Sequence, residues 1–267
     1  MSATASPNSD PLAPAPSLWD RFVASWLWPA TVFALLLIAW EAYVRISGIL
    51  PVILPAPSAV LSYTWDQRAL LLENAWPTLF QCLLGFALAV IGGIAIAVVI
   101  TQFTTIRRGF YPLVVGIALI PKISVAPLFT LWFGAGSVAR VSLVFFIAFF
   151  PMVVSPASGL MSVDAGLLRM ARAFGASPWQ IFWTLRVPSA LPYIFDGMKV
   201  AMSLAVIGII VAEFVTADRG LGYLVIFATG LLDTTMMLAA IILLSVIGLG
   251  LYFAIEAAGK VAVYWRQ

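Results

Sequence analysis

Histidine is absent from this chain of 267 residues, and Cys82 is its only cysteine. A disulfide framework needs pairs of cysteines, and zinc sites need clusters of cysteine and histidine, so the sequence excludes both. Acid–base or nucleophilic catalysis by histidine is excluded as well. We therefore expect no catalytic residues and no metal ligands in this chain.

Charge is also scarce, because Asp, Glu, Lys and Arg make up 9% of the residues while 63% are hydrophobic. Soluble domains carry about 25% charged residues. One globular core cannot bury so much apolar surface, whereas a protein embedded in lipid does not need to, so the composition predicts an integral membrane protein. The net charge of +3 is spread along the chain without a basic patch, and nucleic acid is not an expected partner.

Six apolar segments are long enough to cross a bilayer, for which a helix needs about 20 largely apolar residues. Pro121 and Lys122 interrupt the third segment. The sequence therefore predicts an all-α, polytopic membrane protein with six transmembrane helices. The segments cover residues 28–47, 79–101, 110–133, 138–160, 193–215 and 234–255.

Lysine and arginine near the segment ends set the orientation, because basic residues accumulate on the cytoplasmic side. This bias places both termini and residues 161–192 in the cytoplasm. Residues 48–77 and 216–232 then form outside loops, and the first holds an amphipathic helix with Ser58 as its expected cap. The N-terminal residues before the first span lack the positively charged start of a signal peptide, so we expect the first span to remain uncleaved. The expected parts are a disordered tail and membrane approach over 1–26, a six-helix domain over 27–258 and a cytoplasmic tail over 259–267.

Small residues recur at every fourth position of the second segment, at Gly85, Ala89, Gly93 and Ala97. A stripe of this kind lets helices approach closely in lipid, where no hydrophobic effect drives them together. Glycine and alanine are also simply common in membrane helices. We expect the stripe to be a packing face.

The segment 161–192 interrupts the apolar runs with two short helices. Asp164 can cap the first, which has one apolar face, and Gly175 suits the left-handed position that ends it. Ser177 can cap the second, with Pro178 at its first position, and Pro188 is expected to stop it. The second helix carries aromatic side chains that fit either an interfacial belt or a plug for a groove on another protein. These aromatic residues are Trp179, Phe182 and Trp183.

The stretch GASPWQIFWTLRVPSALPYIF resembles the cytoplasmic "EAA" loop of binding-protein-dependent ABC importer permeases, in particular the nitrate/sulfonate/taurine group. Ala171, Gly175, Leu185, Pro188, Leu191 and Pro192 lie in or beside the places that the loop pattern requires. Further similar segments are LPAPSAV (54–60), IPKISVAPLFTLWFGAG (120–136), IAFFP (147–151), VAEF (211–214) and GLGYL (220–224). One position departs from the pattern, because Arg169 stands where the family has glutamate.

The resemblance implies a type I ABC importer permease-like fold and a transport subunit of a bacterial inner membrane. It also implies a second copy of the chain, two ATPase subunits and an extracytoplasmic solute-binding protein as partners. The chain has no G-x-x-x-x-G-K-[ST] phosphate loop, so ATP and Mg would be held by the ATPase subunits and no cofactor by this chain. The residues implied to couple to the ATPase are Asp164, Arg169, Ala171, Gly175, Ala176, Ser177, Trp179, Phe182, Pro188 and Pro192.

Ionisable residues at membrane depth are costly and usually face a cavity or a partner. Pro121, Lys122 and Glu213 are therefore candidates for lining a translocation pathway, and a cationic Lys122 suits a small anionic solute. Asp196 and Lys199 are i, i+3 neighbours that can also pair with each other. For all these charges, salt bridges or snorkelling are the structural alternative.

Two other functions remain open. An ion-coupled secondary transporter would use Lys122, Glu213, Asp196 and Lys199. A membrane-embedded enzyme is disfavoured by the missing histidine and the single cysteine. Co-purification with an ATPase would separate the importer from the secondary transporter.

Overall fold

The computed structural model describes residues 27–103, 109, 113–114, 116–117, 119–216 and 218–264. Every regular element in these ranges is a helix, as the composition predicts. The expected tail over 1–26 lies outside the described residues, and so do residues 110–112, 115 and 118 of the expected span over 110–133. The chain divides into two compact units, and the division falls between Ala59 and Val60 in the sequence.

The first unit contains α2 (Trp28–Ser47) and the beginning of α3 (Pro57–Asp66). Glu41 of α2 accepts hydrogen bonds from the Ser58 hydroxyl (2.7 Å), from the Ser58 backbone N–H (3.0 Å) and from Arg45 Nε (2.6 Å). The prediction that Ser58 caps α3 is wrong, because the helix already begins at Pro57 and the Glu41 carboxylate takes the N–H in its first turn.

Five helices among the described residues are long and apolar enough to cross a membrane. They are α2, α4 (Arg68–Gln102), α7 (Ser137–Met161), the helix from Pro178 to Thr216 that ends in α10 (Val187–Thr216), and α12 (Thr234–Ala262). Five of the six expected spans, all except the third, are thus confirmed in position. In the third, the described residues include helical positions at 113–114 and 116–117, a 3₁₀ turn, η2 (Lys122–Val125), and α6 (Ala126–Phe133).

Two boundaries differ from the predictions. α4 begins at Arg68, so the second half of the loop expected over 48–77 is helical. α12 continues to Ala262, so the first residues of the tail expected over 259–267 are helical too. Apolar run length identifies the part of a helix that fits the bilayer, but backbone hydrogen bonding carries the helix beyond it.

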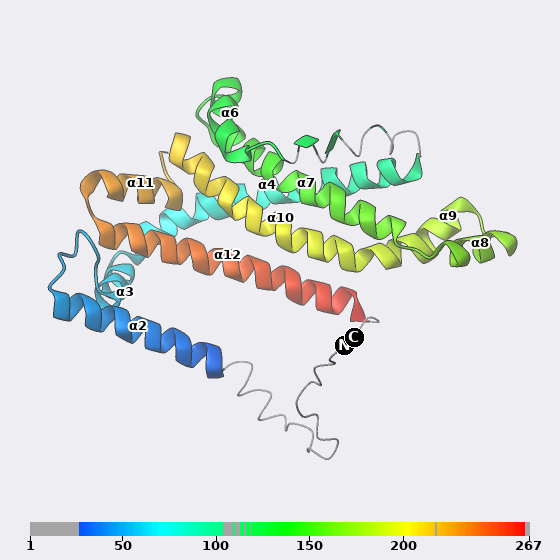
Figure 1. Ribbon diagram of the computed structural model, residues 1–267. Helices are drawn as coiled ribbons and strands as arrows, with labels where there is room; N and C mark the ends of the chain where they lie inside the picture. Colours follow the sequence, from blue (N-terminus) through cyan, green and yellow to red (C-terminus); the bar gives the residue numbers. More distant parts are fainter. Residues whose placement is uncertain are drawn as a thin grey trace, which may run out of the picture. The chain divides into compact units, whose positions relative to one another are not determined.

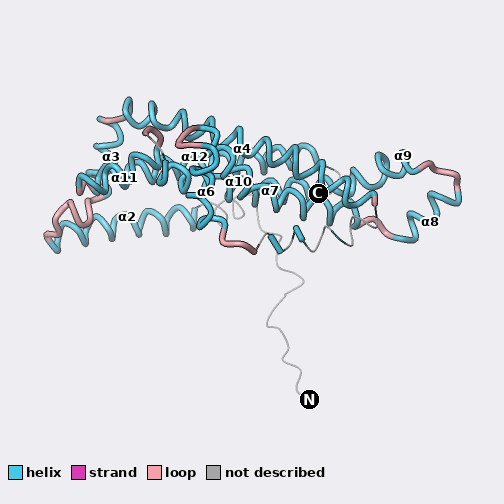
Figure 2. Tube along the Cα trace, turned by 90° about the horizontal axis from the view of Figure 1, so that it is seen from above, coloured by secondary structure: helices cyan, strands magenta, loops and turns pink. Residues whose placement is uncertain are grey.

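Within the second unit, α7 packs against both α4 and α10 (Figures 1 and 2). A Cβ on Gly85 of α4 would lie 2.6 Å from Val144 Cβ of α7, and a Cβ on Gly93 would lie 2.5 Å from Met152 Cβ. Ala89 is fully buried in the same contact. The prediction that the small residues form a packing face is confirmed, because only glycine permits this approach.

Candidate functional site

The predicted loop forms one end of the second unit, where α8 (Ala165–Ala173) and α9 (Pro178–Ile181) extend beyond the long helices (Figures 1 and 2). Asp164 caps α8 as predicted, since its Oδ1 accepts a 3.0 Å hydrogen bond from the Leu167 N–H. α8 therefore has a defined start.

Gly175 ends this helix with a φ of +81°, which confirms the predicted left-handed position. The Ala176 N–H donates to the Ala171 carbonyl and the Gly175 N–H to the Arg172 carbonyl, each at 3.0 Å. These two bonds make a Schellman motif, which satisfies carbonyls at the helix end. The direction of the chain between α8 and α9 is thus set by one glycine.

Ser177 caps α9 as predicted, and Pro178 occupies the first turn. The Ser177 hydroxyl accepts from the Gln180 N–H at 3.3 Å, and Gln180 Oε1 accepts from the Ser177 N–H at 2.8 Å. This capping box satisfies two backbone donors reciprocally. Gln180 was missed in the sequence, although Ser-x-x-Gln is the signature of the motif.

Pro188 does not stop the second helix, contrary to the prediction. A π turn, η3 (Phe182–Arg186), follows α9 directly, and the Val187 N–H bonds to the Phe182 carbonyl five residues back. α10 then contains both Pro188 and Pro192. A local π adjustment changes which carbonyls are paired where proline lacks an N–H, so the helix continues. Pro178–Thr216 is one helical run of 39 residues.

Much of the apolar surface of this loop is uncovered. Phe174 is 84% exposed, Trp179 is 70% exposed and Trp183 is 51% exposed. Phe182 is instead buried beside Leu160. Phe182 therefore packs into the chain's own core beside the π turn and does not present its ring on the surface, unlike Trp179 and Trp183.

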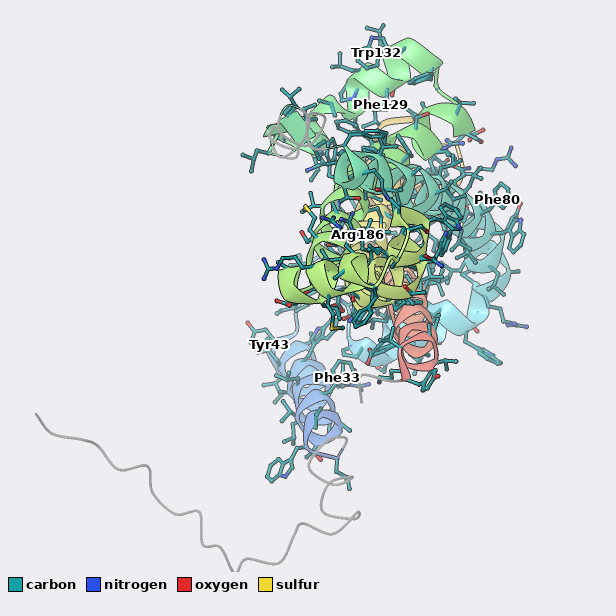
Figure 3. All side chains as sticks on the ribbon, turned by 90° about the vertical axis from the view of Figure 1, so that its right-hand side faces the viewer. Phe33, Tyr43, Phe80, Phe129, Trp132 and Arg186 are labelled. Atoms are coloured by element: carbon teal, nitrogen blue, oxygen red, sulfur yellow. The ribbon has the colours of Figure 1, made fainter. Side chains whose placement is uncertain are left out.

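The same loop also exposes basic side chains, namely Arg169 and Arg172 of α8. Figure 3 faces this end of the unit and labels Arg186 of the π turn. Aromatic residues and arginine are the types enriched at protein interfaces, so the composition of this exposed surface suits binding to another protein.

The predicted pathway residues lie apart from each other and differ in exposure. Lys122 follows Pro121 in the 3₁₀ turn and is half-buried, with Nζ 5.4 Å from the centre of the Phe150 ring. Glu213 is 2% exposed. Its carboxylate accepts from the Thr78 hydroxyl at 2.6 Å and from the Gly222 N–H at 2.7 Å. Glu213 is thus enclosed within this chain and hydrogen-bonded to α4 and to the residues that begin the helix after α10.

Asp196 and Lys199 form an ion pair of 2.8 Å, which confirms the structural alternative for these two residues. Glu256 and Lys260 of α12 form a second pair of 2.7 Å. Both pairs line a surface cavity of about 330 Å³ between α10 and α12. Glu213, Asp196 and Lys199, which the ion-coupled alternative requires, are thus engaged within the chain.

Sequence reasoning also missed a cluster of buried polar side chains near the N-terminal end of α4. All buried polar or charged residues in the described part of the chain belong to it, namely Asn74, Thr78, Gln81, Arg140 and Glu213. The signal was available in part, because the three α4 members stand at i, i+4 and i+7, which is one helix face.

Comparison with known proteins gives a consistent picture. The family model described as "Binding-protein-dependent transport system inner membrane component" matches residues 85–260. The riboflavin transport system permease protein RibX of Chloroflexus aurantiacus is 34% identical over 245 residues, which cover 90% of this chain and 91% of RibX. The taurine transport system permease protein TauC of Escherichia coli is 28% identical and is covered over 93% of its length, with 90% of this chain.

Among solved structures, the inward-facing MetNI methionine ABC transporter contains a chain similar to this one. The TM-score is 0.63 at 21% identity, and the match covers 74% of this chain and 98% of the other. At this identity the similarity shows the fold, which agrees with the predicted importer permease architecture.

Proposed function

Because this chain belongs to the family of inner membrane components of binding-protein-dependent transport systems, we propose that it forms a translocation pathway driven by a separate ATPase, which it contacts through residues 164–192. The chain is the permease component of an ABC importer and a multi-pass membrane protein. The single observation that carries the coupling role is the uncovered surface of α8 and α9, whose caps fix its shape.

The surface has the character of a docking site. Trp179 supplies a large rigid anchor, and such anchors dominate binding at many interfaces. Arg169 and Arg172 can pair with acidic groups of a partner, so the arginine that replaces the family's glutamate changes the sign of the charge at this position. The capping box and the left-handed Gly175 hold the surface in one conformation, which lowers the entropic cost of binding.

The proposed assembly contains two copies of this chain, two ATPase subunits and an extracytoplasmic solute-binding protein. The ATPases would hold ATP and Mg, and this chain would bind no cofactor. Both termini and the loop with α8 and α9 would lie in the cytoplasm, according to the lysine and arginine bias. Closure of the ATPases on ATP would draw the two loops together and switch the pathway between outward and inward access.

The solute is proposed to be small and anionic, and Lys122 supports this. Lys122 lies in the 3₁₀ turn η2, and its ammonium group is near the Phe150 ring of α7. A cation over an aromatic face is attracted by the electrons of the ring. The relatives named for riboflavin and taurine transport differ in solute chemistry, so the argument for an anion rests on Lys122.

The coupling surface can be tested with two tryptophans of similar exposure. Trp179 is 70% exposed on α9, and Trp132 is 65% exposed on α6 (labelled in Figure 3). Trp179→Ala should weaken co-purification of the ATPase subunit by about tenfold or more, as loss of a buried anchor does at other interfaces. Trp132→Ala should leave it unchanged. Equal recovery of the ATPase with both variants would reject the assignment of the coupling surface.

A further inference from the structure

Three consecutive backbone N–H groups at the start of α11 (Leu221–Leu231) are bonded to side chains of other helices. Gly220 N–H donates to Asn74 Oδ1 (2.9 Å), Leu221 N–H to Thr78 Oγ1 (2.9 Å), and Gly222 N–H to Glu213 Oε2 (2.7 Å). The first N–H groups of a helix have no partner within it. Here they are satisfied by α4 and α10, and α11 has no side-chain cap of its own.

The same contacts explain two glycines. Gly220 has a φ of +126°, and a Cβ there would overlap the Glu213 carboxylate. A Cβ on Gly222 would lie 2.9 Å from Glu213 Cβ. The backbone of α11 therefore sits directly on the Glu213 side chain. A carboxylate at a helix N-terminus is further favoured by the helix dipole.

Glu213 stands near the end of the helical run that begins at Pro178 beside the coupling surface. At 1.5 Å per residue the run is about 58 Å long, which exceeds the thickness of the bilayer. Figure 1 shows α9 and α11 at opposite ends of α10. One helix thus connects the surface proposed to contact the ATPase with the cap of α11.

We propose that Glu213 is a positioning residue that makes α11 move with α10, so that displacement of the coupling loop reaches the opposite side of the membrane. Thr78 completes the connection, because its hydroxyl donates to Glu213 Oε1 at 2.6 Å and accepts from Leu221 N–H. α4, α10 and α11 then behave as one body at this end. The inference that α11 moves with the coupling loop rests on the proposed ATPase coupling. The hydrogen bonds at the start of α11 are independent of that proposal.

The contacts can be tested on the purified chain in lipid nanodiscs by amide hydrogen exchange. Glu213→Gln keeps the side-chain shape but replaces one acceptor oxygen with an NH₂ group, and Thr78→Val removes the hydroxyl. Each should raise the exchange rate of the amide whose acceptor it alters, Gly222 in Glu213→Gln and Leu221 in Thr78→Val, by about tenfold, as expected for one lost buried hydrogen bond. Thr78→Ser and Glu73→Gln, a change at an exposed carboxylate nearby on α4, should exchange as the wild type does. We call the capping of α11 by Asn74, Thr78 and Glu213 the trans cap. Unchanged rates in Glu213→Gln and Thr78→Val would overturn it.

The positioning role needs a second readout, the response of two fluorescent reporters to MgATP in the complex with the ATPase. In a Cys82→Ala background, one reporter is attached at Val200→Cys on α10 and the other at Phe227→Cys on α11, both exposed. In the parent both reporters should respond. In Glu213→Gln and Thr78→Val the α10 reporter should respond while the α11 response falls at least fivefold, and Thr78→Ser should restore it.

The outcomes separate the two proposals. A full α11 response in Glu213→Gln and Thr78→Val would overturn the positioning role and leave ATPase coupling intact. Absence of any response at both reporters in the parent would overturn the coupling and the positioning role together, while the hydrogen-exchange result would still decide the trans cap.

Discussion

Arg140 Nε of α7 donates a 2.8 Å hydrogen bond to Gln81 Oε1 of α4, and both side chains are buried. The guanidinium also donates to the Thr216 carbonyl at 3.4 Å and lies 4.0 Å from an Asp218 carboxylate oxygen. A buried cation is tolerated only when such partners replace its hydration. Arg140 therefore joins α7 to α4 and to the end of α10.

Replacing Arg140 should lower stability. Arg140→Met leaves Gln81 Oε1 buried without its donor, and a buried acceptor left without a partner costs about 1–3 kcal/mol. We expect a lower midpoint of thermal unfolding in detergent. Arg172→Met, a change at an exposed arginine, serves as control. Adding Gln81→Leu to Arg140→Met should recover part of the loss, because the unpaired amide is removed; further loss in the double variant would contradict this account.

Two adjacent glycines of α4 offer a matched test of the packing face. A Cβ on Gly93 would lie 2.5 Å from Met152 Cβ and 2.8 Å from its backbone carbon, whereas the nearest atom to a Cβ on Gly92 would be at 3.5 Å. Gly93→Ala should destabilise the protein by about 1–3 kcal/mol through overpacking. Gly92→Ala should be close to neutral or slightly stabilising. Thermal unfolding of the two variants checks this, and equal midpoints would show that α4 and α7 are not closely packed.

The proposed orientation is open to a direct test with reporter fusions. A reporter fused after Gln267 should report the cytoplasm, and one inserted within residues 60–70 should report the outside, because lysine and arginine accumulate on the cytoplasmic side. An external C-terminus would overturn the topology.

Lys122→Met should lower solute uptake into vesicles that contain the assembled importer, with an increase in KM, if the ammonium group attracts an anionic solute. Methionine keeps much of the side-chain length and the contact with Phe150. Lys260→Met removes an equivalent charge at the end of α12 and should leave uptake unchanged. Unaltered uptake by Lys122→Met over a range of solute concentrations would remove the support for an anionic solute.

The sequence by itself determined the features that depend on neighbouring residues. Five spans follow from apolar run length, since a membrane helix satisfies its own backbone in lipid. Asp164, Gly175 and Ser177 have the predicted roles because caps and left-handed turns are decided within three or four residues. Gly85 and Gly93 were identified from their spacing as a packing face, although not the helix that they meet.

Only the tertiary structure decided what depends on residues far apart in the chain. The sequence indicates only that Glu213 is a costly charge in a span, whereas the fold brings Thr78 and Gly222 to its carboxylate. The sequence favours Phe182 as an exposed anchor, whereas in the fold its ring lies in the core beside the π turn. Pro188 is predicted to stop a helix because sequence patterns assume regular α-helical bonding. The charges, rings and prolines were visible in the sequence, but the partners that determine their roles are brought together by the packing of α4, α7 and α10.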